Sequence, residues 1–162
     1  MFAMSDKILG INNLKNPVHL LALGFGAGCV PKLPGTAGTL VGVLFYVLLQ
    51  HLPMLVYTGT VAVFFIIGVW VCGKTARDLG VHDHPAIVWD EITGYLLTMI
   101  MAPRGWLWIL TGFVLFRVFD ILKPWPASWA DKQVKGGFGI MLDDVIAAIY
   151  GLLLLQLIAR LL

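Results

Sequence analysis

Charged residues are scarce in this sequence. Asp, Glu, Lys and Arg make up 12% of its 162 residues, about half of the fraction in a typical soluble domain. Hydrophobic residues make up 59%, and they gather in long runs instead of alternating with charge, which favours lipid as the surrounding medium. The formal net charge is only +2, and no basic patch is interleaved with aromatic residues, so a nucleic-acid partner is not expected.

Cysteine is nearly absent as well. Cys29 and Cys72 lie in or beside apolar runs, which predicts free buried thiols and argues against a disulfide framework. The first fifteen or so residues are polar and lack the apolar core of a secretory signal. We therefore expect residues 1–17 to be a polar cytoplasmic lead-in and residues 18–162 to form one membrane domain.

Five apolar runs follow one another along the chain, several of them shorter than the about 20 residues that a membrane-spanning helix needs. They cover residues 39–49, 54–72, 92–102, 106–119 and 145–162. A further run, residues 18–30, contains Gly24, Gly26 and Gly28, so we expect an interfacial or re-entrant helix packed against the others. The sequence thus predicts an all-α, polytopic membrane helical bundle with about five spans.

Charge is distributed unevenly between the loops of this bundle. With a cytoplasmic N-terminus, the outer segments hold only Arg104 and Arg160 of the eleven Lys and Arg residues, which is the usual bias of membrane proteins. All nine Asp and Glu residues also fall on the inner side. Several lie where an apolar run meets a loop, where an ionised carboxylate is costly unless it is paired or bound to a metal. These junctions predict a site at the cytoplasmic face.

Two of the acidic junctions carry adjacent carboxylates. Asp90 and Glu91 begin the third run, where Asp90 has the alternative role of a helix cap. Asp143 and Asp144 precede the last run and follow three glycines at positions 136, 137 and 139. Neighbouring aspartates repel each other unless a cation lies between them, so this pair favours a metal site.

The third acidic junction combines both signs of charge. Arg117 and Asp120 are three residues apart and share one helical face at the inner end of the fourth run. Lys123 follows at the exit, before a proline that stops the helix. A local ion pair that neutralises Asp120 is the alternative to a functional role.

The loop before the first run resembles a phosphate-binding segment. It supplies Lys32, Gly35, Thr36 and Thr39, and the helix that follows adds free N–H groups at its N-terminus. The segment is not a Walker loop, and Thr36 has the alternative role of an N-cap.

Together these segments offer the hard oxygen ligands that Mg²⁺ prefers and cations that suit a phosphate. They predict metal-assisted phosphoryl hydrolysis, with the substrate's tails in lipid and its headgroup at the inner surface. A cation- or proton-coupled transporter is the alternative, because junctional carboxylates also mark ion paths. Against it, no carboxylate lies within a run and no inverted repeat is visible.

Four segments, residues 26–39, 87–91, 116–126 and 137–144, occur in an order that resembles the phosphatidylglycerophosphatase A family of bacterial membranes. The resemblance runs from about residue 18 to the end of the chain. It implies hydrolysis of phosphatidylglycerophosphate to phosphatidylglycerol and inorganic phosphate in glycerophospholipid synthesis. It also implies Mg²⁺ and a location in the inner membrane, where the charge bias places the active site of this multi-pass protein on the cytoplasmic face. No obligate protein partner is evident in the sequence.

On this basis we assign roles to the candidate residues. One carboxylate acts as general base, with Asp90 and Asp143 both open, and an aspartyl-phosphate intermediate is the mechanistic rival. The expected metal ligands, one or two ions, are Asp90, Glu91, Asp120, Asp143 and Asp144, and the expected catalytic residues are the four aspartates of that set. The expected phosphate-binding residues are Lys32, Gly35, Thr36, Thr39, Arg117 and Lys123.

Overall fold

The computed structural model describes residues 13–162, and the described chain is helical throughout, without strands. Residues 1–12 of the predicted lead-in lie outside the described residues. The all-α prediction is confirmed. The elements are η1 (Asn13–Lys15), α1 (Pro17–Ala22), η2 (Gly24–Cys29), α2 (Pro34–Leu49), α3 (Met54–Leu79), α4 (Trp89–Thr98), α5 (Trp106–Leu122), α6 (Ala127–Gln133) and α7 (Gly136–Leu161).

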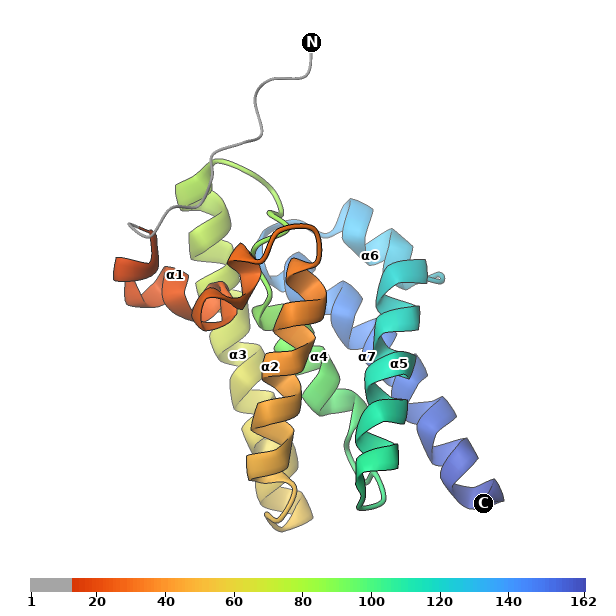
Figure 1. Cartoon of the computed structure of the whole chain (residues 1–162). Helices are drawn as coiled ribbons and strands as arrows, with labels where there is room; N and C mark the ends of the chain where they lie inside the picture. The colour runs from red at the N-terminus through yellow and green to blue at the C-terminus, as the bar shows by residue number, and fades with distance from the viewer. Residues whose placement is uncertain (1–12) are drawn as a thin grey trace.

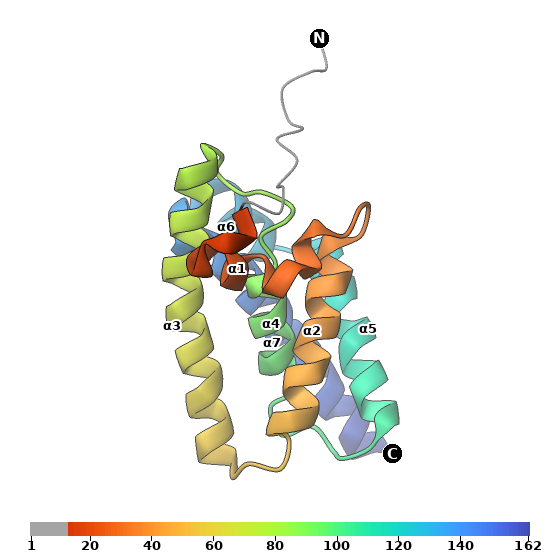
Figure 2. The same ribbon diagram turned by 60° about the vertical axis from the view of Figure 1, so that its left-hand side comes forward.

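The short helix α4 forms the centre of the bundle. Figures 1 and 2 show α2, α3, α5 and α7 running alongside one another, with α4 between them. It packs against all four, and Ile92, Tyr95 and Leu96 have no exposed surface. Because α4 is enclosed by other helices, its backbone and its polar side chains are shielded from the surroundings of the protein.

Only two of the five predicted spans are long enough to cross a membrane by themselves. α3 and α7 have 26 residues each, which corresponds to about 39 Å at 1.5 Å per residue. The others are shorter than the about 30 Å of a hydrocarbon core: α2 has 16 residues, α5 has 17 and α4 has 10. The prediction of about five spans is therefore not confirmed.

α4 is short because the apolar run 92–102 bends before it ends. The helix stops at Thr98, and Met101 adopts a left-handed φ of 58°. Ala102 donates its backbone N–H to Met99, and a proline follows at position 103. Apolar composition alone does not reveal this turn, because the residues that make it are as hydrophobic as those of the helix.

The glycine-rich run 18–30 is also interrupted. It forms α1 and then η2. The backbone is left-handed at three successive residues at the start of η2, namely Gly24, Phe25 and Gly26. A Cβ on Gly28 would lie 1.9 Å from the carbonyl oxygen of Ala86, so the loop before α4 crosses η2 in direct backbone contact. This agrees with the prediction of a broken helix packed against the rest of the bundle.

The outer surface of the bundle is apolar. Only 28% of the most hydrophobic stretch of α3 is buried inside the protein, and side chains such as Leu55 and Ile66 are 84% and 67% exposed. Exposed apolar area of this extent on a long helix needs apolar surroundings. The two long helices therefore indicate association with a membrane.

Candidate metal and phosphate site

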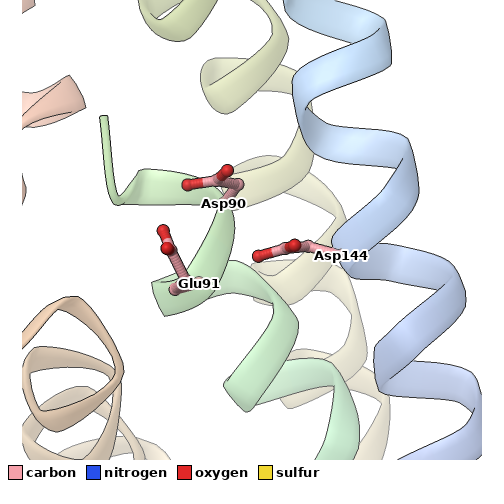
Figure 3. Close-up of side chains that lie close together, drawn as sticks. All are labelled: Asp90, Glu91 and Asp144. Carbon is pink, nitrogen blue, oxygen red and sulfur yellow. The ribbon is translucent and has the colours of Figure 1, made fainter. Parts of the chain in front are cut away.

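Three carboxylates from two helices meet at the start of α4. Asp90 and Glu91 lie in its first turn, and Asp144 comes from the third turn of α7. One oxygen of each lies within 4.8 Å of the others. Figure 3 shows Asp144 reaching from α7 toward the N-terminal turn of α4, where Asp90 and Glu91 stand.

Contacts of Trp89 and its neighbour fix where α4 begins. The Trp89 indole donates to the carbonyl of Phe64 at 2.9 Å and stacks on the Phe64 ring. Val88 donates its backbone N–H to Ala22 at 2.9 Å, and no side chain caps the helix. The first-turn carboxylates of α4 thus lie at the positive end of a helix dipole, which favours their charge.

Close helix contacts bring α7 to the same place. A Cβ on Gly137 would lie 1.9 Å from the carbonyl oxygen of Val69 on α3, so α3 and α7 touch through their backbones. A Cβ on Gly94 would meet the Phe116 ring at 2.5 Å and the Asp144 carbonyl at 3.4 Å. These glycines let α3, α4, α5 and α7 approach closely enough for the carboxylates to converge.

Asp90 and Asp144 are buried, Glu91 is half-buried, and all three carboxylates are incompletely paired within the described residues. Asp90 is 7% exposed and Asp144 is 3% exposed. The atoms Asp90 Oδ1, Glu91 Oε2 and Asp144 Oδ2 are buried and accept no hydrogen bond within the described residues. Buried polar atoms are normally satisfied, and three like charges are costly without compensation. This set of hard, unpartnered oxygens fits a divalent cation such as Mg²⁺.

The predicted ligand Asp120 has a different partner. Its Oδ2 accepts from Arg117 Nη1 in an i,i+3 ion pair at the end of α5. This is the local ion pair that the sequence offered as the alternative to a functional role. Arg117 Nε remains buried without an acceptor among the described residues. The structure therefore places Asp120 beside the cluster as the partner of an arginine, and its role as a metal ligand stays a prediction.

Arg117 also lies against the start of α2. A Cβ on Gly35 would come within 2.5 Å of Glu91 Oε1 and within 3.0 and 3.2 Å of the two Arg117 Nη atoms. The first turn of α2, the Arg117 guanidinium and the carboxylate cluster therefore meet at one point. Only glycine leaves room there.

The residues of the predicted phosphate-binding segment differ in whether their polar groups are already used within the protein. Leu33, not Thr36, occupies the N-cap of α2 and provides no side-chain cap, so the N-cap alternative for Thr36 is wrong. The N–H groups of Gly35 and Thr36 have no acceptor in the described part of the chain, and they remain free for an anion. Thr39 donates its hydroxyl to the Gly35 carbonyl at 2.8 Å, so its proton is used within the helix. Lys32 is exposed, in the loop before α2.

Lys123 and Asp143 are paired with each other. The Lys123 Nζ atom donates to Asp143 at 2.6 Å and to Asp131 at 2.8 Å. Burial lowers the pKa of the Lys123 amino group, but the hydrogen bonds to both carboxylates outweigh this, so the pKa is raised and the charge is retained. Lys123 therefore compensates Asp143, and its role toward phosphate stays a prediction.

Sequence reasoning missed Asp131 of α6. It lies eight residues after Lys123, beyond the proline break and outside any common helical face. Its contact depends on the left-handed φ of 42° at Lys123, which no residue pattern predicts. Asp131 could be noticed only as one more acid on the inner side.

Comparison with known proteins gives a consistent result. A family model described as Phosphatidylglycerophosphatase A matches residues 20–159. Phosphatidylglycerophosphatase A of Escherichia coli is 47% identical over 137 residues, which cover 84% of this chain and 80% of that protein. Phosphatidylglycerophosphatase A of Haemophilus influenzae is 48% identical over 143 residues, covering 87% and 88%. No solved structure matches the chain. The chain therefore belongs to the phosphatidylglycerophosphatase A family.

Proposed function

We propose that this chain hydrolyses phosphatidylglycerophosphate to phosphatidylglycerol and inorganic phosphate, with Mg²⁺ as cofactor. The observation that carries the proposal is the cluster of unpartnered carboxylate oxygens of Asp90, Glu91 and Asp144, next to the free first-turn amides of α2. Such a pairing of a cation site with an anion site suits a phosphate ester. The names of the related enzymes supply the substrate.

Asp90, Glu91 and Asp144 would hold Mg²⁺, with Asp120 and Asp143 near enough to support them. When bound, the ion polarises the phosphate and makes water easier to deprotonate. Without the ion, the cluster repels a phosphate dianion. Activity therefore depends on divalent cation in this proposal.

The chain's own groups bind the phosphate from the other side. The N–H groups of Gly35 and Thr36 and the Arg117 guanidinium face the phosphoryl oxygens, where hydrogen bonds strengthen as charge develops in the transition state. Lys32, in the exposed loop before α2, attracts the headgroup as it approaches. Asp120 holds the Arg117 guanidinium in place through their ion pair.

In the hydrolytic step, the oxygen of a water molecule attacks phosphorus and the bond from phosphorus to the glycerol oxygen breaks. A carboxylate takes one proton from the water, and this proton then passes to the leaving glycerol oxygen, which becomes the hydroxyl of phosphatidylglycerol. Asp90 is our choice of base, since Asp143 is bound to Lys123. An acid-stable phosphate adduct on an aspartate, formed and consumed at the rate of turnover, would replace this step with the aspartyl-phosphate route.

The membrane arrangement is also part of the proposal. In Figure 1, α6 and the N-terminal end of α2 lie at one end of the bundle, and the loop between α4 and α5 lies at the other end with the C-terminus. Lys32 directly precedes α2 and Lys123 lies between α5 and α6, whereas Arg104 lies in the loop between α4 and α5. With more basic residues at the end that bears the site, this end faces the cytoplasm. The chain is then a multi-pass protein of the bacterial inner membrane, with α2 and α5 reaching only part of the way across.

The chain belongs to a family of phosphatases, and this leaves the transporter alternative without support. The test is phosphate release by the purified protein from phosphatidylglycerophosphate and from phosphatidic acid, with Mg²⁺ and with a chelator. We expect Mg²⁺-dependent release from phosphatidylglycerophosphate. Absence of release with Mg²⁺ present, from protein that is folded, would contradict the proposal.

A further inference from the structure

An apolar groove of about 450 Å³ lies on the outside of the bundle, between α3 and α7. Its wall on α3 includes Ala62, Phe65 and Ile66, and its floor is formed by Leu97 and Ile100 at the end of α4. Thr58 is its one polar residue, and the Thr58 hydroxyl donates to backbone carbonyls of its own helix. The lining therefore offers hydrocarbon surface with no free polar group.

The groove begins at the depth of the carboxylate cluster. Its residue on α7 is Val145, which directly follows Asp144. On α3, the Phe64 carbonyl accepts from Trp89 at the start of α4, so Phe65 and Ile66 lie level with Asp90.

The groove ends near the other end of α4. Tyr57 donates to the Leu96 carbonyl, so Thr58 lies level with the last turn of that helix. From Thr58 to Ile66 the wall rises about 12 Å. Asp90 and Leu97 are seven residues apart, about two turns, and so share one face of α4. One face of α4 thus carries a carboxylate at its start and the floor of the groove at its end.

We propose that this groove holds an acyl chain of the lipid substrate while its phosphate lies at the carboxylate cluster. The inference rests on the proposed function, and it adds a second recognition element to it. The occupant is a substrate chain because the groove lining includes Val145, the residue after Asp144, and because the groove lies on the two helices that are long enough to cross a membrane. In lipid the groove gains little from the hydrophobic effect, so its contribution is to position the headgroup.

Substitution at Ala62, an exposed residue of the groove wall, provides the main test. Ala62→Trp fills the groove, whereas Val63→Trp adds the same ring at a neighbouring position of α3 that is 52% exposed and outside the groove. Phosphate release is measured on phosphatidylglycerophosphate with long chains and on a short-chain, water-soluble analogue. We expect Ala62→Trp to lower kcat/KM about tenfold for the long-chain substrate, about 1.4 kcal/mol, and less than about twofold for the analogue. Val63→Trp is expected to leave both close to wild type.

Equal effects of Ala62→Trp on both substrates, or equal effects of the two tryptophan variants, would overturn the inference. Wild-type protein inactive on both substrates would instead overturn the proposed function. If Ala62→Trp does not fold, the wild-type protein decides. Phosphatidylglycerophosphate with a diazirine midway along one chain should crosslink to Leu97 or Ile100, and an identically labelled phosphatidylcholine should not. Equal labelling by both lipids would mean that ordinary surrounding lipid fills the groove.

Discussion

The acids of α4, α5, α6 and α7 fall into two groups that differ in their partners. Asp120, Asp131 and Asp143 each accept from an arginine or a lysine. Asp90, Glu91 and Asp144 each keep a buried oxygen that has no hydrogen-bond partner among residues 13–162. The first group is neutralised by basic side chains of the protein, and the second group is the one to which the proposed function assigns a cation.

The adjacent pair Asp143 and Asp144 illustrates how this division arises. Successive residues of a helix point about 100° apart, so one side chain faces Lys123 at the end of α5 and the other faces the start of α4. Both are almost fully buried, at 5% and 3% exposure. Burial therefore does not distinguish their roles, and the difference lies in the neighbours that each one meets.

The largest effect is expected for Asp144→Asn. Losing one ligand of the unpartnered cluster should lower kcat by about 100- to 1000-fold, the range for removal of one strong transition-state contact. It should also remove the rise in Tm that Mg²⁺ gives the wild-type protein, because ligand binding to the folded state stabilises it. Asp143→Asn is the matched control, and it should retain the Tm response. The division between the two groups fails if both variants lose it alike.

A smaller loss is expected for Gly35→Ala. The added methyl group would collide with Glu91 Oε1 and press on the Arg117 guanidinium, so the cation site and the anion site would be forced apart. We expect kcat/KM to fall about tenfold or more, since misplacement by about 1 Å is enough for a large loss. Gly59→Ala, where nothing lies within 4 Å, should keep full activity and stabilise α3 by about 0.5–1 kcal/mol. Equal activity of the two variants would show that the close contact at Gly35 has no role in turnover.

Asp120→Asn tests whether Asp120 belongs with the paired group. If it positions Arg117, its loss should raise KM several-fold, about three- to tenfold, and leave the Mg²⁺ concentration for half-maximal activity unchanged. A titration of activity with Mg²⁺ measures both. An increase in the Mg²⁺ requirement like that of Asp144→Asn would instead assign Asp120 to the cation, as the sequence suggested.

The smallest effect is expected for Asp131→Asn. Partly exposed ion pairs contribute about 0–1 kcal/mol, and Asp143 remains to compensate Lys123, so activity should stay within about twofold. The raised pKa of Lys123 gives stability that is complete below the unfolded value of about 10.4 and is lost only as pH rises above it. The difference in Tm between Asp131→Asn and wild type should therefore not change between about pH 8 and 9. This range lies above the titration of Asp83, whose pKa is raised to about 6 by burial and by the nearby charges of Asp143 and Asp131. A difference that grows within that window would contradict the pairing.

The sequence predicted the fold well where composition alone determines the structure. Long apolar runs become α2, α3, α5 and α7, and the placement of the acids at one end follows from the order of those runs. It was less informative where geometry decides. The turn at Met101 that shortens α4 and the left-handed backbone at Lys123 have no signature in composition. The turn at Met101 makes the third predicted span shorter than expected. The backbone at Lys123 accompanies contacts of its side chain with Asp131 and Asp143, which local spacing does not predict.

The sequence also could not show which side chains meet when they are far apart in the chain. Arg117 and Asp120 could be paired from sequence because three residues on a helix fix their distance. Asp144 and Glu91 are more than fifty residues apart, and their meeting depends on backbone contact between helices at Gly137 and Gly94. The three glycines before Asp143 suggested that the backbone approaches another group closely, but the sequence did not show which segment it approaches, and Gly94 was not singled out. Their use as contact points becomes visible once the helices are packed.

The enclosure of α4 has a consequence for how the protein is made. A helix of ten residues that begins with two carboxylates is too short and too polar to enter a bilayer by itself. In a membrane, α3 and α7 would insert independently, and α4 would find its place only after they stand on either side of it. Since α7 is synthesised after α4, the site would be completed only once α7 is in place. A nascent chain would not act on the lipids around it until α7 has been inserted.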